Sequence, residues 1–207
     1  MKILIADDHK LFRDGLKHII TEKLGGVTFI EVNNYGELNN ILNELSCDIA
    51  IIDLNMPGRS GIDALKDIKS IYPNLPVIVL SMYPEEQFAL RVIKAGAAAY
   101  LTKDANPSEL ISAIKSVTGG NVFFTEKVAR IIANDLMLDK KNSLDVLSDR
   151  EFQVFLMIAS GKSLTEIANE LSLSIKTIST HRSHILEKLN LSSNAELTRF
   201  ALENELL

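Results

Sequence analysis

The chain has 207 residues, of which 46% are hydrophobic and 24% are charged, and this balance excludes disordered and collagen-like proteins. The single Cys47 excludes an internal disulfide, and no apolar run approaches the ~18 residues of a membrane span. The net charge of −5 argues at first against a nucleic-acid binder, because such proteins are often basic. The sequence therefore predicts a soluble, cytoplasmic protein without a membrane partner.

Five short apolar runs alternate with helical-period segments up to about residue 118. The runs lie at residues 3–6, 29–32, 49–52, 77–80 and 98–101. Most are continuously apolar, which is typical of strands covered on both faces, and the segments between them are long enough for helical crossovers. Residues 1–118 are therefore predicted to form an α/β domain with a doubly wound, five-stranded parallel sheet of the flavodoxin-like kind.

The rest of the chain predicts helices without strands. Residues 125–138 carry one apolar stripe at helical spacing, and polar residues 139–143 follow them, so residues 119–143 are predicted to be a linker that includes a helix. From residue 144 to 207, capping serines precede stretches of helical period. These serines are Ser148, Ser163, Ser174 and Ser193. The pattern predicts a small all-α domain of four helices at residues 144–207.

Charged and hydroxyl side chains come directly after four of the five apolar runs. They are Asp7 and Asp8 after the first run, Asp53 after the third, Ser81 after the fourth and Lys103 after the fifth. In an open parallel sheet the carboxyl ends of the strands share one edge, so these groups are expected to converge there. Neighbouring carboxylates repel one another, and Mg²⁺ is the hard cytosolic cation that offsets this repulsion.

Such an edge is suited to a phosphoryl group. Beside a bound metal, a carboxylate can act as the nucleophile toward a phosphoryl donor, and Asp53 is the best candidate because it ends the central run. The turn at residues 55–58 is expected to expose this carboxylate and to bring the Asn55 carbonyl toward the metal. Lys103 would balance further negative charge, and Ser81 could donate a hydrogen bond.

In this order and spacing, these residues resemble the receiver domain of two-component response regulators, over residues 1–118. The resemblance implies that a histidine kinase donates a phosphoryl group to Asp53. It implies further that Asp8, Asp53 and the Asn55 carbonyl bind Mg²⁺, with Asp7 acting through water, and that Lys103 contacts the phosphate.

The same resemblance makes Ser81 and Tyr100 a switch pair, in which the hydroxyl moves to the phosphate and the aromatic ring swings inward. For Tyr100, the alternative is an ordinary core or edge-strand aromatic. The chain departs from many receivers at Asp104, where they have proline.

Residues 164–178 read as a helix, a short turn and a second helix, the layout in which the second helix enters the major groove of DNA. On a helical wheel the second helix buries a stripe of Ile175, Ile178, Ile185, Leu186 and Leu189. The opposite face presents small hydroxyl side chains beside cations, which suit base edges and phosphates. A generic amphipathic helix is the alternative.

The segments Leu147-Ser148-Asp149-Arg150-Glu151, Glu166-Ile167-Ala168 and Thr177-Ile178-Ser179-Thr180-His181-Arg182 resemble the LuxR-type helix-turn-helix signature. A receiver joined to this module is the architecture of the NarL/FixJ family of transcriptional regulators. The resemblance places base reading on Ser179, Thr180 and Ser183, and backbone contacts on Lys176, His181, Arg182 and Lys188.

Three points in this module stay open. Arg182 lies beside the apolar stripe, so a structural role is an alternative to a DNA contact. Ser179 departs from the lysine common in relatives, which affects the preferred DNA sequence. The last helix, with Leu197, Phe200 and Leu202, resembles the segment through which these domains dimerise on DNA, and packing within the module is its alternative.

These patterns favour a non-enzymatic, phosphorylation-dependent, DNA-binding response regulator that forms a homodimer when phosphorylated or bound to DNA. One alternative is a regulator that binds DNA without phosphorylation. Another is a Mg²⁺-dependent small-molecule phosphatase, which needs a second carboxylate two residues after the nucleophile, where this chain has Asn55. Residues 144–207 carry nine acidic and six basic side chains, so few phosphate contacts and a dimeric binding mode are expected.

Overall fold

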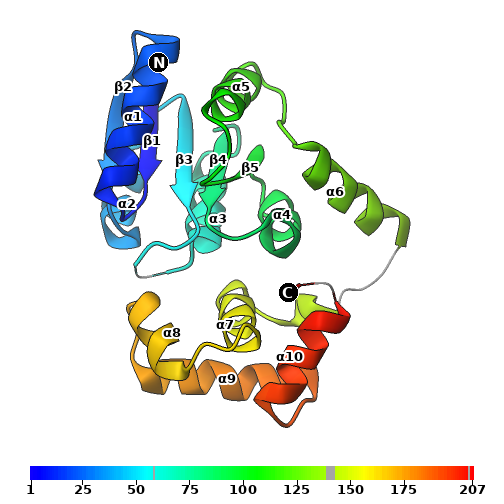
Figure 1. Cartoon of the computed structure of the whole chain (residues 1–207). Coiled ribbons are helices and arrows are strands. Elements are labelled where there is room, and N and C mark those ends of the chain that lie inside the picture. Colours follow the sequence, from blue (N-terminus) through cyan, green and yellow to red (C-terminus); the bar gives the residue numbers. More distant parts are fainter. Residues whose placement is uncertain (58, 139–142, 205) are drawn as a thin grey trace. The chain divides into compact units, whose positions relative to one another are not determined.

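A computed structural model describes residues 1–57, 59–138, 143–204 and 206–207 of the chain. The chain divides into two compact units, Met1–Asn134 and Asp135–Leu207, which differ in their secondary structure. The first unit combines a sheet with helices, and the second is built from helices (Figure 1). The predicted α/β fold followed by a small helical domain is confirmed.

The sheet of the first unit is parallel, with the strand order β2-β1-β3-β4-β5. Its strands are β1 (Lys2–Ala6), β2 (Thr28–Val32), β3 (Ile49–Asp53), β4 (Val77–Ser81) and β5 (Ala99–Thr102). The registry pairs Asp53 with Leu80, and Ser81 with Thr102, so the last residues of β3, β4 and β5 lie along one edge of the sheet. The order of the strands confirms the doubly wound topology.

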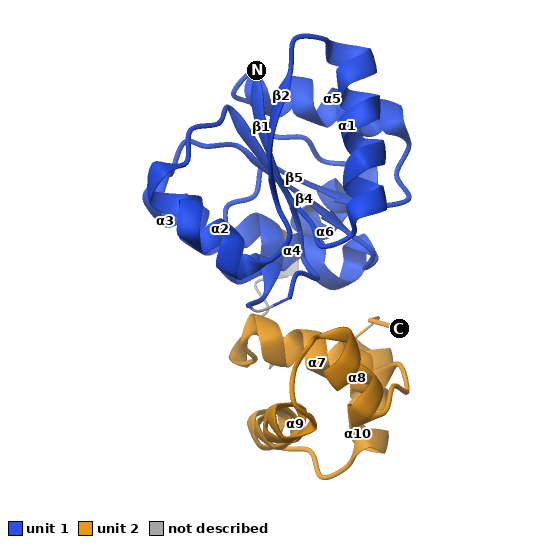
Figure 2. Ribbon diagram, turned by 90° about the vertical axis from the view of Figure 1, so that its left-hand side faces the viewer, with its two compact units in different colours: residues 1–134 blue, residues 135–207 orange. Residues whose placement is uncertain are grey.

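Helices cover both faces of this sheet. They are α1 (Lys10–Leu24), α2 (Tyr35–Ile41), α3 (Gly61–Ile71), α4 (Glu85–Lys94) and α5 (Pro107–Thr118), with a short 3-10 turn η1 (Leu42–Glu44). Leu16 and Ile20 of α1 and Ile114 of α5 pack on strand residues such as Ile51 within one apolar core. Figure 2 shows α1 and α5 together on one side of the sheet, and α2 and α3 on the other.

The segment after α5 returns to the free edge of the sheet. The Phe123 N–H donates to the Ala98 carbonyl at 2.9 Å, which places Phe123 beside β5. Helix α6 (Glu126–Leu138) then begins next to α4, because Thr125 Oγ1 donates to Glu85 Oε1 at 2.7 Å and Lys127 Nζ lies 2.6 Å from Glu86 Oε1. Of the polar linker residues expected at 139–143, residues 139–142 lie outside the described part of the chain.

The second unit contains η2 (Ser143–Val146), α7 (Asp149–Ala159), α8 (Leu164–Glu170), α9 (Ile175–Leu189) and α10 (Asn194–Glu203). Each of the four predicted capping serines accepts a hydrogen bond from the backbone N–H three residues later. Ile178 and Ile185 of α9 are buried as expected, but Ile175 is 52% exposed, against the prediction. Ile175 is the first residue of its helix, so its side chain lies at the end of the stripe. Among the described helices, none combines the length and the apolar character needed to cross a membrane.

Candidate functional site

The edge at the strand ends brings the predicted polar groups of the first unit together. Lys103, one residue beyond β5, places its Nζ 2.7 Å from Asp53 Oδ2 and 2.6 Å from Asp7 Oδ2. The same ammonium group lies 4.7 Å from the centre of the Phe12 ring. Because parallel strands end at a common edge, Lys103 meets Asp7, which is nearly one hundred positions away in the sequence. Asp7, Asp8 and Asp53 together form an acidic pocket at this edge.

Burial and charge act against each other in this pocket. The side chains of Asp7, Asp53 and Lys103 are each no more than 5% exposed. Burial raises the pKa of the Asp53 carboxyl, and although Lys103 opposes this rise, Asp7 adds to it. Burial alone would lower the pKa of the Lys103 ammonium, but Asp53 and Asp7 outweigh it, so this pKa is raised. Lys103 therefore stays charged and compensates two buried carboxylates.

The oxygens that Lys103 leaves free fit a divalent cation. Asp53 Oδ1 is buried and has no hydrogen-bond partner among the residues that the structure describes. Ligand atoms of Asp7, Asp8, His9 and Asp53 all lie within 4.8 Å of one another. A buried carboxylate oxygen without a donor, beside further carboxylates, is the donor set that a hard cation needs.

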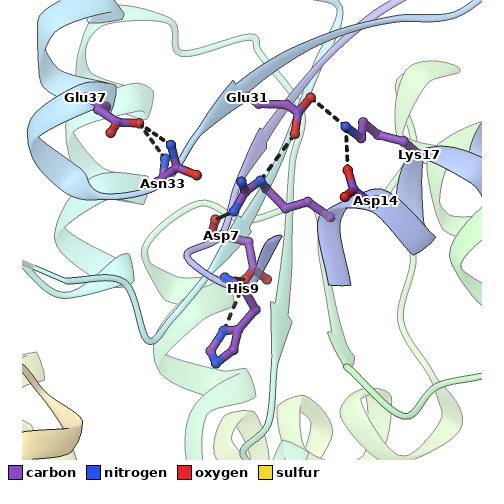
Figure 3. Close-up of polar contacts among 8 residues, drawn as sticks. Asp7, His9, Asp14, Lys17, Glu31, Asn33 and Glu37 are labelled. Carbon is purple, nitrogen blue, oxygen red and sulfur yellow. Dashed lines mark hydrogen bonds and ion pairs between the residues drawn. The ribbon is translucent and has the colours of Figure 1, made fainter. Parts of the chain in front are cut away.

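His9 is a member of this cluster that the sequence analysis missed. Its Nδ1 lies 2.8 Å from Asp8 Oδ1. Its backbone N–H donates to Asp7 Oδ1 at 2.8 Å, and Figure 3 shows the His9 ring beside Asp7. Its position directly after two aspartates was the available signal, because imidazole is a common metal ligand.

A close backbone approach holds the loop after Asp53. The Gly61 N–H donates to the Leu54 carbonyl at 3.1 Å, so the start of α3 lies against the end of β3. A Cβ at position 61 would lie 2.3 Å from the Asp53 carbonyl oxygen and 2.5 Å from Leu54 Cα, distances that only glycine avoids. This loop carries Asn55, whereas Gly58, the last residue of the predicted turn, lies outside the described residues. The role of Gly61 was missed because the contact joins two elements.

Ser81 and Tyr100, the predicted switch pair, lie next to each other. Tyr100 is fully buried, and its hydroxyl donates to the Tyr83 carbonyl at 2.7 Å. The Ser81 hydroxyl accepts from the Tyr83 N–H at 3.1 Å and also hydrogen-bonds the Tyr100 side chain. Burial raises the pKa of the Tyr100 phenol, which therefore stays protonated. Ser81, Tyr83 and Tyr100 thus form one network, and the aromatic ring points inward.

The outer face of α9 in the second unit carries small hydroxyl groups. Lys176, Ser179, Thr180 and Ser183 are exposed there. Thr180 Oγ1 donates to the Lys176 carbonyl at 3.0 Å, and Ser183 Oγ donates to the Ser179 carbonyl at 3.1 Å. Each of these two hydroxyls donates its proton to a backbone carbonyl of the helix. Its oxygen keeps lone pairs that can accept hydrogen bonds from base amino groups.

The cations predicted for the DNA backbone differ in how free they are. Lys188 Nζ lies 2.6 Å from Oε2 of the buried Glu151, and Arg182 Nε donates to Asn194 Oδ1 at 2.6 Å. His181 is half-buried, and burial lowers its pKa, so its ring is neutral near pH 7. Lys176 is exposed and is the predicted cation that no such contact ties down within the described structure.

Two family models match these two parts of the chain. The response regulator receiver domain matches residues 3–115, and the luxR family of bacterial regulatory proteins matches residues 145–201. The chain is a response regulator of the NarL/FixJ family. The acidic pocket thus belongs to the receiver domain of this response regulator, and α8 and α9 are the helix-turn-helix of its DNA-binding domain.

The relatives of this response regulator match it along their whole length. The oxygen regulatory protein NreC of Staphylococcus carnosus is 34% identical, over 100% of this chain and 99% of its own. RcsB of Salmonella enterica serovar Typhimurium, bound to promoter rprA in the presence of phosphomimetic BeF3-, is 29% identical with a TM-score of 0.64, covering 97% of this chain and 98% of its own. A structure of two RcsB dimers bound to two parallel DNAs is 30% identical with a TM-score of 0.60, covering 99% and 98%. The resemblance drawn from the sequence is confirmed.

Proposed function

We propose that this response regulator is switched by phosphorylation of Asp53 by a histidine kinase, and that the switch controls its binding to double-stranded DNA. The observation that carries the proposal is Asp53 Oδ1, a buried carboxylate oxygen to which no described residue donates, in a chain that also holds a helix-turn-helix. We assign its work to the cytoplasm, because both proposed partners, the kinase's phosphohistidine and DNA, are met there. It acts as a regulator and not as an enzyme on a small molecule.

Mg²⁺ is the cation proposed for the acidic pocket. Asp8, Asp53 and the Asn55 carbonyl would hold it, with Asp7 acting through water. A bound Mg²⁺ supplies positive charge for the phosphoryl oxygens and lowers the repulsion between the carboxylates.

The chain's own residues then account for the transfer. An oxygen of Asp53 attacks the phosphorus, and the bond from phosphorus to the imidazole nitrogen of the kinase histidine breaks, leaving its electron pair on that nitrogen. Lys103, which is already between two carboxylates, needs only to turn toward a phosphoryl oxygen. Burial of the pocket strengthens each of these charge interactions.

The signal leaves the pocket through Ser81. When the Ser81 hydroxyl turns to the phosphoryl group, it gives up its contact with the Tyr83 N–H, while Tyr100 holds the Tyr83 carbonyl. Glu85 lies two residues beyond Tyr83 and accepts from Thr125, at the start of the helix that leads out of the receiver. The contacts support a route from Asp53 to α6.

DNA binding is assigned to α9. Ser179, Thr180 and Ser183 are proposed to read base edges, and Lys176 to contact the phosphate backbone. His181, Arg182 and Lys188 stay proposed backbone contacts, although Arg182 and Lys188 also hold the domain together. Because so few cations are free, we assign tight binding to a homodimer on two half-sites, as in the RcsB dimers bound to DNA.

The proposed domains are a receiver at residues 1–118, a linker at 119–143 and a DNA-binding domain at 144–207. The family matches at 3–115 and 145–201 support the first and last. The Thr125 and Lys127 contacts hold the first turn of the linker helix on the receiver.

The experiment that tests the proposed chemistry is mass spectrometry after treatment with a small phosphodonor. Wild-type protein with Mg²⁺ is expected to gain one phosphoryl group, located on Asp53, and to lose this gain when EDTA removes the metal. Asp53→Ala is expected to gain none. Phosphorylation of Asp53→Ala to the wild-type extent would overturn the assignment, and turnover of a phosphomonoester would favour the phosphatase alternative.

A further inference from the structure

In the described part of the chain, a buried guanidinium group on α1 contacts the backbone of the acidic pocket and not its carboxylates. The Arg13 side chain is only 7% exposed, and its Nη1 donates to the backbone carbonyl of Asp7. Its Nε lies 3.3 Å from Glu31 Oε2 on β2. Arg13 therefore ties together the end of β1, the start of α1 and β2, and it does so without approaching any of the pocket's carboxylates in the contacts described.

The charge of Arg13 is balanced by its own surroundings. Lys17 Nζ lies 2.7 Å from Glu31 Oε1 and 2.9 Å from Asp14 Oδ1, so two cations and two anions alternate along this chain of contacts (Figure 3). Hydrogen bonds from Lys17, and then from Arg13, lower the pKa of Glu31 against the effect of burial. Glu31 stays ionised at neutral pH and fixes the guanidinium plane from one side.

The carbonyl that Arg13 holds belongs to the peptide between two proposed metal-pocket residues. This peptide joins Asp7 to Asp8, and the Asp7 N–H donates to the Val32 carbonyl at 3.2 Å. The His9 N–H donates to Asp7 Oδ1 at 2.8 Å. Arg13 adds the third of these contacts on Asp7. Without it, the buried Asp7 carbonyl would lose the donor that the described residues give it, and the peptide could rotate.

We propose that Arg13 is a positioning residue, which sets the affinity of the pocket for Mg²⁺ by fixing the peptide that carries Asp7 and Asp8. This inference rests on the proposed function, because it takes the pocket to be a Mg²⁺ site. Groups that orient metal ligands typically change metal affinity about 10- to 100-fold when they are removed.

Whether removal of Arg13 weakens or tightens Mg²⁺ binding distinguishes a positioning role from an effect of its positive charge alone. A cation near the pocket repels Mg²⁺, so if Arg13 acted through its charge alone, its removal would tighten Mg²⁺ binding. If it acts by holding the Asp7 carbonyl, its removal weakens binding. Lysine at this position keeps the charge but cannot donate to Asp7 and Glu31 in the same forked geometry.

The test is the dissociation constant for Mg²⁺, measured by isothermal titration calorimetry on the full chain. Arg13→Met is expected to raise it about 10-fold, and Arg13→Lys to raise it by less. Lys17→Met is the matched control, because it removes one positive charge from the same network without touching Asp7, and about a twofold change at most is expected. Asp8→Asn shows whether the binding measured belongs to the pocket.

A second readout uses the phosphodonor reaction. Arg13→Met is expected to need about 10-fold more Mg²⁺ for half-maximal phosphorylation, yet to approach the wild-type rate at saturating Mg²⁺. Thermal unfolding without metal checks that the variant folds, and if it does not, Arg13→Lys decides.

The outcomes are distinct. Unchanged or tighter Mg²⁺ binding in Arg13→Met, or a wild-type constant in Arg13→Lys when Arg13→Met is unfolded, overturns the role of Arg13. If wild-type protein itself binds no Mg²⁺, or if Asp8→Asn binds it equally well, the Mg²⁺ site of the proposed function fails, and the role of Arg13 fails with it.

Discussion

The acidic pocket of the receiver and the outer face of α9 use charge in opposite ways. In the pocket, Lys103 is buried between two carboxylates that the sheet topology brings to it. On the outer face of α9, formed by Lys176, Ser179, Thr180 and Ser183, three of the four exposed side chains are small hydroxyls. Lys188 is turned to the buried Glu151 of its own domain. The pocket is therefore built before its ligand arrives, whereas the proposed DNA-binding face of α9 carries little charge with which to attract DNA.

This difference explains how a chain with a net charge of −5 can bind DNA as part of a regulatory switch. Phosphate contacts supply most of the sequence-independent affinity for DNA, and each needs a free cation. A single α9 offers Lys176 but few further free cations, so its affinity is expected to depend on placing two copies together. In the proposed function the buried charges of the receiver provide the means, because phosphorylation of Asp53 would change them.

Removal of the buried ammonium group is expected to have the largest effect on stability. Lys103→Met leaves two buried carboxylates without compensation and is expected to cost about 3 kcal/mol in the free energy of unfolding. Urea denaturation measures this cost, and added Mg²⁺ is expected to recover part of it. The control is Lys127→Met, whose ion pair with Glu86 is exposed and contributes less than about 1 kcal/mol. Equal effects of the two substitutions would show that the pocket is not preorganised.

A methyl group added behind Asp53 is expected to disturb the same pocket through the backbone. Gly61→Ala forces the new Cβ against the Asp53 carbonyl and is expected to destabilise the receiver by about 2 kcal/mol and to slow phosphorylation. Gly15→Ala in α1 is the matched control, because nothing lies within 4 Å of its Cβ, and it is expected to stabilise by about 0.5 kcal/mol. A neutral Gly61→Ala in urea denaturation would contradict the close approach.

Acid is expected to weaken the DNA-binding domain through Glu151. Burial alone would raise the pKa of Glu151, but the hydrogen bonds from Lys188 and Ser148 together outweigh it and hold this pKa below its ordinary value of 4.5. Its stabilisation is therefore present above pH 4.5 and is lost as the pH falls through the lowered pKa. Glu151→Gln is expected to cost about 1.5 kcal/mol at pH 7, and the difference from wild type is expected to shrink in acid. A difference independent of pH in urea denaturation would argue against the ion pair.

The smallest effect is expected for the free cation of α9. Lys176→Met is expected to reduce by about 1 the slope of the logarithm of the DNA association constant against the logarithm of salt concentration. Lys162→Met is the control, because Lys162 pairs with Glu170. If both variants lower the slope equally, Lys176 is not a particular phosphate contact.

The sequence was informative wherever the chain's own periodicity decides the outcome. Short apolar runs, most of them continuous, marked β1 to β5, and the parallel topology alone was enough to predict that Asp7, Asp53 and Lys103 converge. Serine three residues before glutamate marked the starts of α7 and α8. These features depend on neighbours in sequence or on a shared sheet edge, which local patterns record.

Contacts between distant elements could not be predicted in this way. Lys188 of α9 and Glu151 of α7 form an ion pair although they are 37 positions apart in the sequence. The hydrogen bond from Thr125 to Glu85 joins the segment before α6 to α4. The approach of Gly61 to the Asp53 backbone depends on how β3 and α3 meet. Each of these contacts depends on how helices and strands pack together. The sequence therefore identified the candidate cations of α9 but not which of them are held in contacts within the domain.

The most direct measurement is the affinity for DNA before and after phosphorylation. Wild type and Asp53→Ala would be titrated at physiological salt against a fragment of the chain's own upstream genomic region, each with Mg²⁺ and with or without the phosphodonor. Wild type is expected to bind at least about 10-fold more tightly after treatment, and Asp53→Ala to stay unchanged. Equal tightening in both proteins, or tight binding of unphosphorylated monomers, would contradict control of the DNA-binding face by the pocket.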